Sequence, residues 1–458
     1  MNKGPVLMRL MMFTVMISSM SALMFNIVLP QISQEFGMTL AQTSWLTTAY
    51  TLIYAFGTVT YGKLADRFQL KTLITFGLTL FAAGSLVGLV SHTFWLALAG
   101  RCMQSAGAAA LPALALLIPV RYFSPEQRGS AVSMTAVGLA LGGALGPVVA
   151  AIISSVADWR WLFLPSLLIL VLLPVFRRNL ANEPKGPASK FDWLGGALLA
   201  ASISAILLAV TKLEWTYGIT GAISLLLFVA RVRSVKPEEA FIQPRLFRNK
   251  PYTILLALIF LVGCIITSLY FMTPILLSNV YHLESGQIGF ALVPAAIVSA
   301  IVGRQGGKLA DRKGSSYVFT VAACSLIAFF LLLSIFVGIP PLWISLFLIL
   351  GNVGQSFVQI SMSSAVSRTL SKEQAGVGMG LFSMMNFISQ GLAASIYGIL
   401  ASQSSSVNWN PLNSHPEGYA FSNLYLVLAL LLVVILIFYR VRFGKAQAVL
   451  VPAAVAAK

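Results

Sequence analysis

Charged residues are scarce in this chain. They make up 9% of its 458 residues, whereas apolar residues make up 58%; a soluble domain carries roughly 25% charged residues. A water-soluble protein of this length could not bury so much apolar surface, so the composition excludes the soluble classes and indicates a chain that folds in lipid. Because lipid offers the backbone no hydrogen bonds and the apolar runs are continuous, we expect an all-α polytopic membrane protein.

Cysteine, histidine and membrane-embedded acidic residues are also rare. Cys102, Cys264 and Cys324 fall inside apolar runs, which favours isolated thiols over a disulfide framework, and the three histidines are too scattered for a metal site. All thirteen acidic residues lie in loops or near the ends of apolar runs. No run contains paired carboxylates or a Ser-His dyad, so we expect neither an enzyme nor a metal or cofactor.

Fourteen apolar runs of about 20 residues predict fourteen membrane-spanning helices. They cover residues 8–29, 43–61, 72–91, 95–119, 130–155, 160–176, 193–211, 215–231, 252–277, 286–303, 316–337, 341–367, 377–401 and 419–439. Of the 30 basic residues, Arg101 lies within a span and only Arg160 and Lys212 lie in loops opposite the termini, which leaves 27 on the side of the termini. This asymmetry predicts that both termini are cytoplasmic. Because topology accounts for the basic residues, we expect no nucleic-acid partner.

The hexamer GKLADR occurs at residues 62–67 and again, unchanged, at 307–312, which is 245 positions later. The same shift brings the first six spans onto the last six, and residues 126–129 (EQRG) have their counterpart in 373–376 (EQAG). The repeat predicts two parallel six-helix bundles, with a substrate site between them near the membrane midplane. The expected division is an N-terminal bundle (1–177), a linker with two inserted helices (178–250), a C-terminal bundle (251–445) and a tail (446–458).

Each hexamer is predicted to form a turn that acts as a conformational latch. Glycine allows two helix ends to approach, aspartate can meet the positive N-terminus of a neighbouring helix, and Arg67 and Lys71 can pair with carboxylates across the half. The latch residues are Gly62, Asp66, Arg67, Lys71, Gly307, Asp311 and Arg312. The alternative is that these charges only fix topology, which would require only basic residues.

Arg101 lies inside an apolar run. A centred arginine costs roughly 2.5–3.5 kcal/mol on insertion scales, so we expect it to face a wet cavity or a partner, with Gln104 and Ser105 on the same helix face. The alternative is a side chain that snorkels to a nearby interface.

Glycines recur at every fourth position in the fifth span, at Gly138, Gly142 and Gly146, and Pro147 adds a bend. Such a stripe permits close contact between helix backbones. We expect it to pack against a helix of the other half in one conformation, with permanent tight packing as the alternative.

Uncharged polar residues mark the expected substrate cavity. They are Asn26, Tyr50, Tyr54, Gln104, Tyr270, Gln355, Gln359, Asn386 and Gln390. Gln355 with Gln359, and Asn386 with Gln390, are four positions apart, so each pair presents one polar stripe. The alternative for each residue is that it joins helices by hydrogen bonds.

These motifs resemble those of the major facilitator superfamily. The hexamer followed by Lys71 is similar to that family's loop between helices two and three, residues 101–109 to its helix-four motif, and residues 138–147 to the helix-five motif of its drug/proton antiporters. Residues 26–30 (Asn-x-x-Leu-Pro) and the 6+2+6 arrangement extend the resemblance to the fourteen-helix drug:proton antiporters, within which the chain looks most similar to the tetracycline exporters of Gram-positive bacteria.

The resemblance implies the major facilitator fold with two inserted helices, alternating access, and efflux of a small amphipathic drug or antibiotic in exchange for protons, with Arg101 tied to coupling. It also implies a monomer in the inner (plasma) membrane of a bacterial cell, with a small-molecule substrate, protons and membrane lipid as partners.

Where members of the resembled family carry acidic residues, this chain has Ser21, Gly142 to Ala144 and Gln390. One alternative is therefore a neutral, zwitterionic or anionic substrate, and another is coupling through Asp66, Asp311 and Arg101. A further alternative is an exporter or facilitator of an endogenous metabolite such as a siderophore, a lipid or a self-made antibiotic.

Overall fold

The computed structural model describes residues 4–38, 40–43, 45–65, 67–124, 127–181, 192–212, 214–236, 239–283, 285–371, 374–401, 407–413 and 415–448, and these ranges contain no strand. The elements are α1 (Gly4–Glu35), α2 (Leu40–Thr43), α3 (Trp45–Leu64), α4 (Leu70–Leu89), α5 (Phe94–Ala108), α6 (Ala110–Tyr122), α7 (Arg128–Val156), η2 (Trp159–Phe163), η3 (Pro165–Leu168), α8 (Ile169–Asn179), α9 (Trp193–Lys212), α10 (Trp215–Ser234), α11 (Arg245–Arg248), α12 (Lys250–Asn279), α13 (Ser285–Lys313), α14 (Ser315–Phe336), α15 (Pro341–Thr369), α16 (Ala375–Ala401), η4 (Pro416–Gly418) and α17 (Tyr419–Ala448). Every predicted span coincides with a helical segment, which confirms the all-α polytopic fold.

Twelve helical segments in the described ranges are long and apolar enough to cross a membrane. The other two predicted spans are α3 and α16, which have 20 and 27 residues. These two helices pack against each other, one from each half of the chain.

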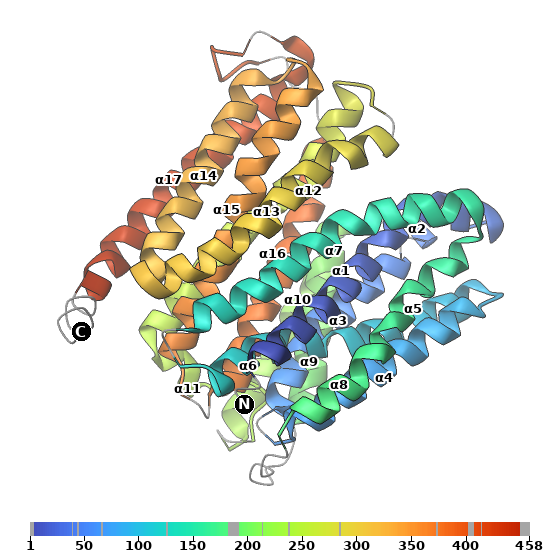
Figure 1. Cartoon of the computed structure of the whole chain (residues 1–458), viewed down its shortest axis with the longest axis vertical. Coiled ribbons are helices and arrows are strands. Elements are labelled where there is room, and N and C mark those ends of the chain that lie inside the picture. Colours follow the sequence, from blue (N-terminus) through green and yellow to red (C-terminus); the bar gives the residue numbers. More distant parts are fainter. Residues whose placement is uncertain are drawn as a thin grey trace.

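Two groups of helices make up the molecule, and α7 and α13 lie side by side between them (Figure 1). In the first half α1 packs on α7 and α4 packs on α5, and in the second half α14 packs on α15 and on α17. The most extensive contacts between the halves are those of α7 with α13 and of α3 with α16, and α7 also meets α15 while α6 meets α16. The inserted helices α9 and α10 pack on each other, and α9 also contacts α3 and α16.

Helix α1 begins and α17 ends on the same, lower-left side of the molecule in Figure 1. An even number of crossings requires this arrangement. Because each hexamer closes the second span of its half, both copies belong to this side, which we call the hexamer side.

The second hexamer is helical, so the prediction of a turn is wrong for this copy. Residues 307–312 form the last turns of α13, which continues to Lys313. The helix stops at Gly314, whose φ of 86° is a left-handed conformation that favours glycine. In the first copy α3 ends at Leu64, inside the hexamer.

Candidate functional site

Asp311 of the second hexamer caps the N-terminus of α7 in the other half of the molecule. The Gly129 backbone N–H donates to Asp311 Oδ1 over 2.9 Å, and the Ser130 N–H donates to Oδ2 over 2.8 Å. The first N–H groups of a helix have no partner within it, and its N-terminus carries a partial positive charge. The carboxylate therefore satisfies two donors and binds the halves together.

Glycine is required on both sides of this contact. A Cβ atom added to Gly307 would lie 2.5 Å from Ser133 Oγ and 2.7 Å from the Gly129 carbonyl oxygen. A Cβ atom added to Gly129 would lie 2.7 Å from Asp311 Oδ1. Any side chain at either position would push α7 and α13 apart, so these glycines set the distance between the two halves.

The first hexamer makes the equivalent approach between α3 and α16. A Cβ atom added to Gly62 would lie 2.5 Å from the Gly376 carbonyl oxygen and 3.1 Å from Gly380 Cα. Gly376 is the second residue of α16, just as Gly129 is the second residue of α7. The duplicated EQxG segments thus lie where the duplicated hexamers meet them, each across the boundary between the halves.

The other predicted latch residues lie around these contacts. Asp66 lies outside the described residues. Arg67 stacks over its neighbour Phe68, with 5.4 Å from Cζ to the ring centroid. Lys71 is in the first turn of α4, and Arg312 is exposed on the last turn of α13.

The first hexamer is also held within its own half. Arg121 Nη2 donates a hydrogen bond to the Ala65 carbonyl oxygen over 2.7 Å, which joins α6 to the end of α3. No motif in the sequence marked Arg121 for this contact.

Arg101 is completely buried, with 0% of its surface exposed, so the snorkelling alternative is wrong. Its guanidinium lies between two aromatic rings, 4.2 Å from the Phe25 centroid and 4.1 Å from the Tyr50 centroid. Stacking on both faces is a cation–π arrangement that partly replaces water. Arg101 Nη1 donates to Gln104 Oε1 over 2.7 Å.

The hydrogen bonds of Arg101 connect four helices. Its Nε and Nη1 approach the carbonyl oxygens of Leu46 and Ser21, each at 3.4 Å, and Gln104 Nε2 donates to Ser85 Oγ over 2.9 Å. Arg101 Nη2 has no hydrogen-bond partner, and the structure gives the side chain no carboxylate partner among its described residues. This cluster therefore contains a buried cation that is compensated by dipoles and rings.

Buried hydroxyl groups without partners surround this cation. The hydroxyl oxygens of Ser18, Ser21 and Tyr50 are buried and make no hydrogen bond to a described group. Of the two expected environments, a wet cavity or a partner, the structure shows partners, namely the Gln104 amide and two carbonyl oxygens. Ser105 joins the same cluster by donating to the Tyr50 carbonyl oxygen.

The polar residues predicted in the second half form two connected groups. The Tyr270 hydroxyl donates to Gln355 Oε1, and its oxygen also lies 3.1 Å from Asn352 Oδ1, so the two side chains share this donor and α12 is joined to α15. Asn386 Nδ2 donates to Gln359 Oε1, and Gln390 Nε2 donates to Asn386 Oδ1, both over 3.4 Å. These stripes lie on α15 and α16, and Gln390 is exposed.

The two polar regions meet through aromatic rings. Tyr50 and Tyr54 of α3 stack with centroids 5.9 Å apart, and Tyr54 meets Phe387 of α16 edge-on at 4.6 Å. A series of stacked rings therefore leads from Arg101 to α16, where Phe387 is next in the sequence to Asn386 of the amide stripe. The side chain of Asn26 lies outside the described residues.

The glycine stripe of α7 packs on α1 of the same half. A Cβ atom added to Gly138 or Gly142 would lie 2.3 Å from the carbonyl oxygen of Met12 or Met16, respectively. The expectation of a partner in the other half is therefore wrong here, because α7 turns a different face, that of Gly129 and Ser133, toward α13. Gly146 also faces α1, and the side chain of Pro147 lies outside the described residues.

Several polar residues of the site were missed from the sequence. Asn352 precedes Gln355 by three positions and shares its helix face, so the spacing could have revealed it. Ser299 Oγ lies 2.6 Å from Ser356 Oγ and 3.1 Å from the Asn352 carbonyl oxygen, which joins α13 to α15. Single serines in apolar runs carry no such signal.

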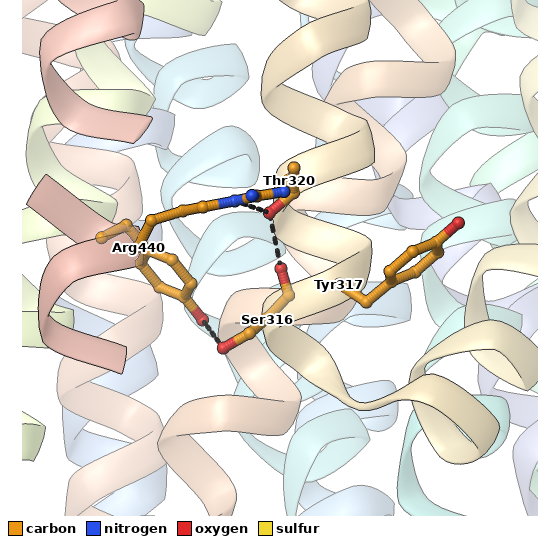
Figure 2. Close-up of a pocket in the computed structure, with 5 residues that line it drawn as sticks. Ser316, Tyr317, Thr320 and Arg440 are labelled. Atoms are coloured by element: carbon orange, nitrogen blue, oxygen red, sulfur yellow. Dashed lines mark hydrogen bonds between the residues drawn. The ribbon is translucent and has the colours of Figure 1, made fainter. Parts of the chain in front are cut away.

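A small cavity of about 200 Å³ lies between α14 and α17 (Figure 2). Arg440 Nε donates to Thr320 Oγ1 over 3.3 Å, and Ser316 Oγ lies 3.5 Å from the Tyr439 hydroxyl. None of the residues predicted to bind substrate lines this cavity, and it is formed within the second half alone.

Comparison with known proteins agrees with this geometry. The sequence profile of the Major Facilitator Superfamily matches residues 11–193 and 191–394. Riboflavin transporter RibZ of Clostridioides difficile is 23% identical over 415 residues, which cover 89% of this chain and 90% of the relative. Multidrug resistance protein 3 of Bacillus subtilis is 25% identical over 372 residues, which cover 78% of this chain and 71% of the relative.

Two solved structures share the fold. The human organic anion transporter MFSD10 has a TM-score of 0.64 at 16% identity and covers 95% of this chain and 97% of its own. The proton:xylose symporter XylE has a TM-score of 0.67 at 12% identity and covers 97% of this chain and 96% of its own. At these identities the likeness concerns the fold alone.

Proposed function

The chain belongs to the Major Facilitator Superfamily, whose members are membrane transporters rather than enzymes, and from this premise we propose that it is a secondary active exporter of a small amphipathic drug or antibiotic. In this proposal, protons move in the opposite direction and access to the substrate site alternates between the two faces. The observation that carries the proposal is the Asp311 cap on α7, because it is polar, glycine-lined and placed between the two halves.

A contact of this kind suits a rocking transporter. A surface-accessible charge–dipole interaction contributes roughly 0.3–1 kcal/mol, and up to about 2 kcal/mol when partly buried. It can therefore favour one conformation without preventing the other. We infer that residues 1–177 and 251–445 move as two bodies, that the hexamer side is closed in this structure, and that it opens when Asp311 leaves α7.

The substrate site in this proposal lies between the Arg101 cluster and the amide stripes of α15 and α16. Tyr54, Phe387 and the amides of Gln359 and Asn386 offer aromatic surface and uncharged hydrogen-bonding groups, a combination suited to amphipathic molecules. Arg101 couples transport to protons through its hydrogen bonds and the unpaired hydroxyls beside it. A tetracycline-like molecule fits this chemistry, and the named function of the Bacillus subtilis relative supports drug export.

A second candidate is the export or facilitated passage of an endogenous neutral or anionic metabolite. The observation that favours it is the buried cation without a described carboxylate partner, together with the lack of acidic residues in mid-span. A cationic drug would find an unfavourable charge at this site. The similarity to a riboflavin transporter is compatible with this candidate.

Transport by reconstituted protein decides between the candidates. We expect vesicles that contain the protein to move a tetracycline or another amphipathic drug against its gradient when a proton gradient is imposed, and to stop when a protonophore is added. Transport of a neutral or anionic metabolite, with no movement of cationic drugs, would favour the second candidate. Substrate transport at the same rate with and without a proton gradient would contradict antiport.

The proposal also covers the orientation of the chain in the membrane and its oligomeric state. The excess of basic residues on the hexamer side indicates that this side and both termini face the cytoplasm of a bacterial cell, with the chain in the inner membrane. All the groups of the proposed site come from one chain, so we propose that a monomer is the transporting unit.

A further inference from the structure

A cavity of about 960 Å³ lies between the two halves on the hexamer side, next to the Asp311 cap. Its walls come from the first turns of α1, the start of α7 and the last turns of α13. It therefore borders the contact that the proposed function expects to open and close.

The cavity is strongly basic. Arg304, Lys308 and Arg312 follow each other at intervals of four along α13, and Arg9 faces them from α1. Side chains four positions apart share one helix face, where like charges repel. Asp311 is the acidic residue among the lining residues, and its oxygens already accept the N–H groups of α7. The lining of the cavity therefore carries an excess of positive charge.

Three of these cations are not engaged by other side chains that the structure describes. Arg9, Arg304 and Lys308 are exposed, and among the described residues none of them has an ion pair or hydrogen bond through its side chain. Arg9 belongs to the first half, whereas Arg304 and Lys308 belong to the second half. An anion bound among them would therefore contact both halves at once.

Apolar side chains line the part of the cavity that lies deeper along α1, α7 and α13. Phe13 and Ile301, with 46% and 65% of their surfaces exposed, line it together with Met12, Met134 and Val137. Ile301 is one turn from Arg304, and Phe13 is one turn from Arg9, so each cation has an apolar neighbour toward the membrane interior. A free inorganic anion would leave this surface uncovered, whereas a phospholipid covers it with an acyl chain.

We propose that this cavity binds an anionic phospholipid, with its phosphate among Arg9, Arg304 and Lys308 and an acyl chain along Phe13, Met134 and Ile301. Basic pockets between membrane helices suit anionic headgroups, and each basic residue near the membrane surface adds to the attraction. Because the lipid contacts both halves, it stabilises the conformation in which the hexamer side is closed. The stabilising effect rests on the proposed alternating access, whereas the binding of the lipid does not depend on it.

Lipid retention tests the binding. Full-length protein is purified in detergent, incubated with phosphatidylglycerol or phosphatidylcholine, and its bound lipid is measured by native mass spectrometry. We expect preferential retention of phosphatidylglycerol, and the triple variant R9Q/R304Q/K308Q is expected to weaken retention by about tenfold or more. The matched control R178Q/K236Q/R442Q removes two arginines and one lysine from exposed positions elsewhere and is expected to retain the lipid as the unaltered protein does.

Three results would overturn the proposal: equal retention of the two lipids, an equal loss in both triple variants, or release of the lipid by excess inorganic phosphate. The last result would show that the cations bind a free anion.

The conformational effect has a separate readout. Spin labels at positions 177 and 313, one on each half, report the distance across the hexamer side in vesicles. Phosphatidylglycerol is expected to increase the short-distance population over that in phosphatidylcholine, and R9Q/R304Q/K308Q is expected to abolish the difference. If the lipid binds the cavity but leaves the distances unchanged, the claim that it stabilises the closed conformation is contradicted. The claim that it binds is not affected by this result. If the bundles do not move at all, the proposed function fails and the lipid site is unaffected.

Discussion

Arg101 shows how a single buried charge can be accommodated in a membrane protein without an ion pair. Two rings, a glutamine and two carbonyl oxygens surround it in place of water. The sequence predicted that Arg101 faces a wet cavity or a partner, and that Gln104 lies on the same helix face because the two residues are three positions apart. It could not predict Phe25 and Tyr50 as the stacking partners, because they come from other spans.

Replacing Arg101 by alanine is expected to abolish proton-driven transport, a loss of at least about tenfold, while the protein still reaches the membrane. R101K is expected to be impaired as well, because an ammonium group cannot stack flat between two rings or donate in a fork. The measurement is substrate uptake by vesicles, with R178A as a control that removes an exposed arginine. Full transport by R101A would show that coupling does not involve this residue.

Glu35 provides a pH-dependent contribution to stability beyond the membrane-spanning part of α1. A hydrogen bond from Arg160 holds the pKa of this carboxyl below its ordinary value of 4.5. Trp159 Nε1 also donates to it over 2.6 Å, and the Arg160–Glu35 ion pair measures 2.5 Å. Because the folded pKa is depressed, the stabilisation is complete above the ordinary pKa and is lost as the pH falls through the folded value.

E35Q is therefore expected to lower the melting temperature at pH 7 and to have a smaller effect at pH 3, which is below the ordinary pKa of the carboxyl. The shift should be small, about 1–2 °C, because the side chain is partly exposed to solvent. Thermal unfolding of the purified protein at both pH values provides the measurement. An equal decrease at pH 7 and at pH 3 would mean that the carboxylate charge is not responsible.

Helix α7 illustrates how one element serves both bundles. Its Gly138, Gly142 and Gly146 face is packed on α1, and its Gly129 and Ser133 face meets α13. The sequence revealed the first stripe because its spacing of four is regular. It did not reveal which helix the stripe contacts, since spacing gives a face and not a partner.

Alanine substitutions at two adjacent glycines distinguish the effect of close helix packing from the effect of merely replacing a glycine. A Cβ atom at Gly142 would lie 2.3 Å from the Met16 carbonyl oxygen, whereas one at Gly143 would have Leu23 Cδ1 at 3.9 Å as its neighbour. We expect G142A to destabilise the fold by about 1–3 kcal/mol. G143A is expected to be neutral or to stabilise by about 0.5–1 kcal/mol, because alanine favours helix. Unfolding in denaturant distinguishes the two, and equal effects would contradict the packing of this face.

Helix α13 also offers one closely packed glycine and one glycine without a close neighbour. G307A would force α7 and α13 apart, whereas Gly289 has no atom within 4 Å of an added Cβ. We expect G307A to reduce transport at least about tenfold with each bundle still folded, because overpacking costs roughly 1–3 kcal/mol at this contact. G289A is expected to transport normally in the same vesicle assay. Normal transport by G307A would mean that the halves need not approach this closely.

At the scale of the whole molecule, the repeat was the most informative feature of the sequence. A hexamer that returns after 245 positions predicted two equivalent halves, and the paired EQxG segments extended the match. The structure adds that the first glycine of each hexamer meets the glycine of the EQxG segment in the opposite half. The sequence could not reveal this pairing across the halves, because it depends on how the two bundles pack. The end of α13 at Gly314 and the basic cavity also could not be predicted, because no motif marks them.

Closure of the hexamer side by the Asp311 cap on α7, and release of this cap during transport, can be measured directly. The measurement is the distance between spin labels at positions 177 and 313, in a cysteine-free background in vesicles. We expect a short and a long population, with D311N shifting the balance toward the long one and the control E417Q leaving it unchanged. A single distance that is the same with and without substrate, with and without a proton gradient, and in D311N would contradict it.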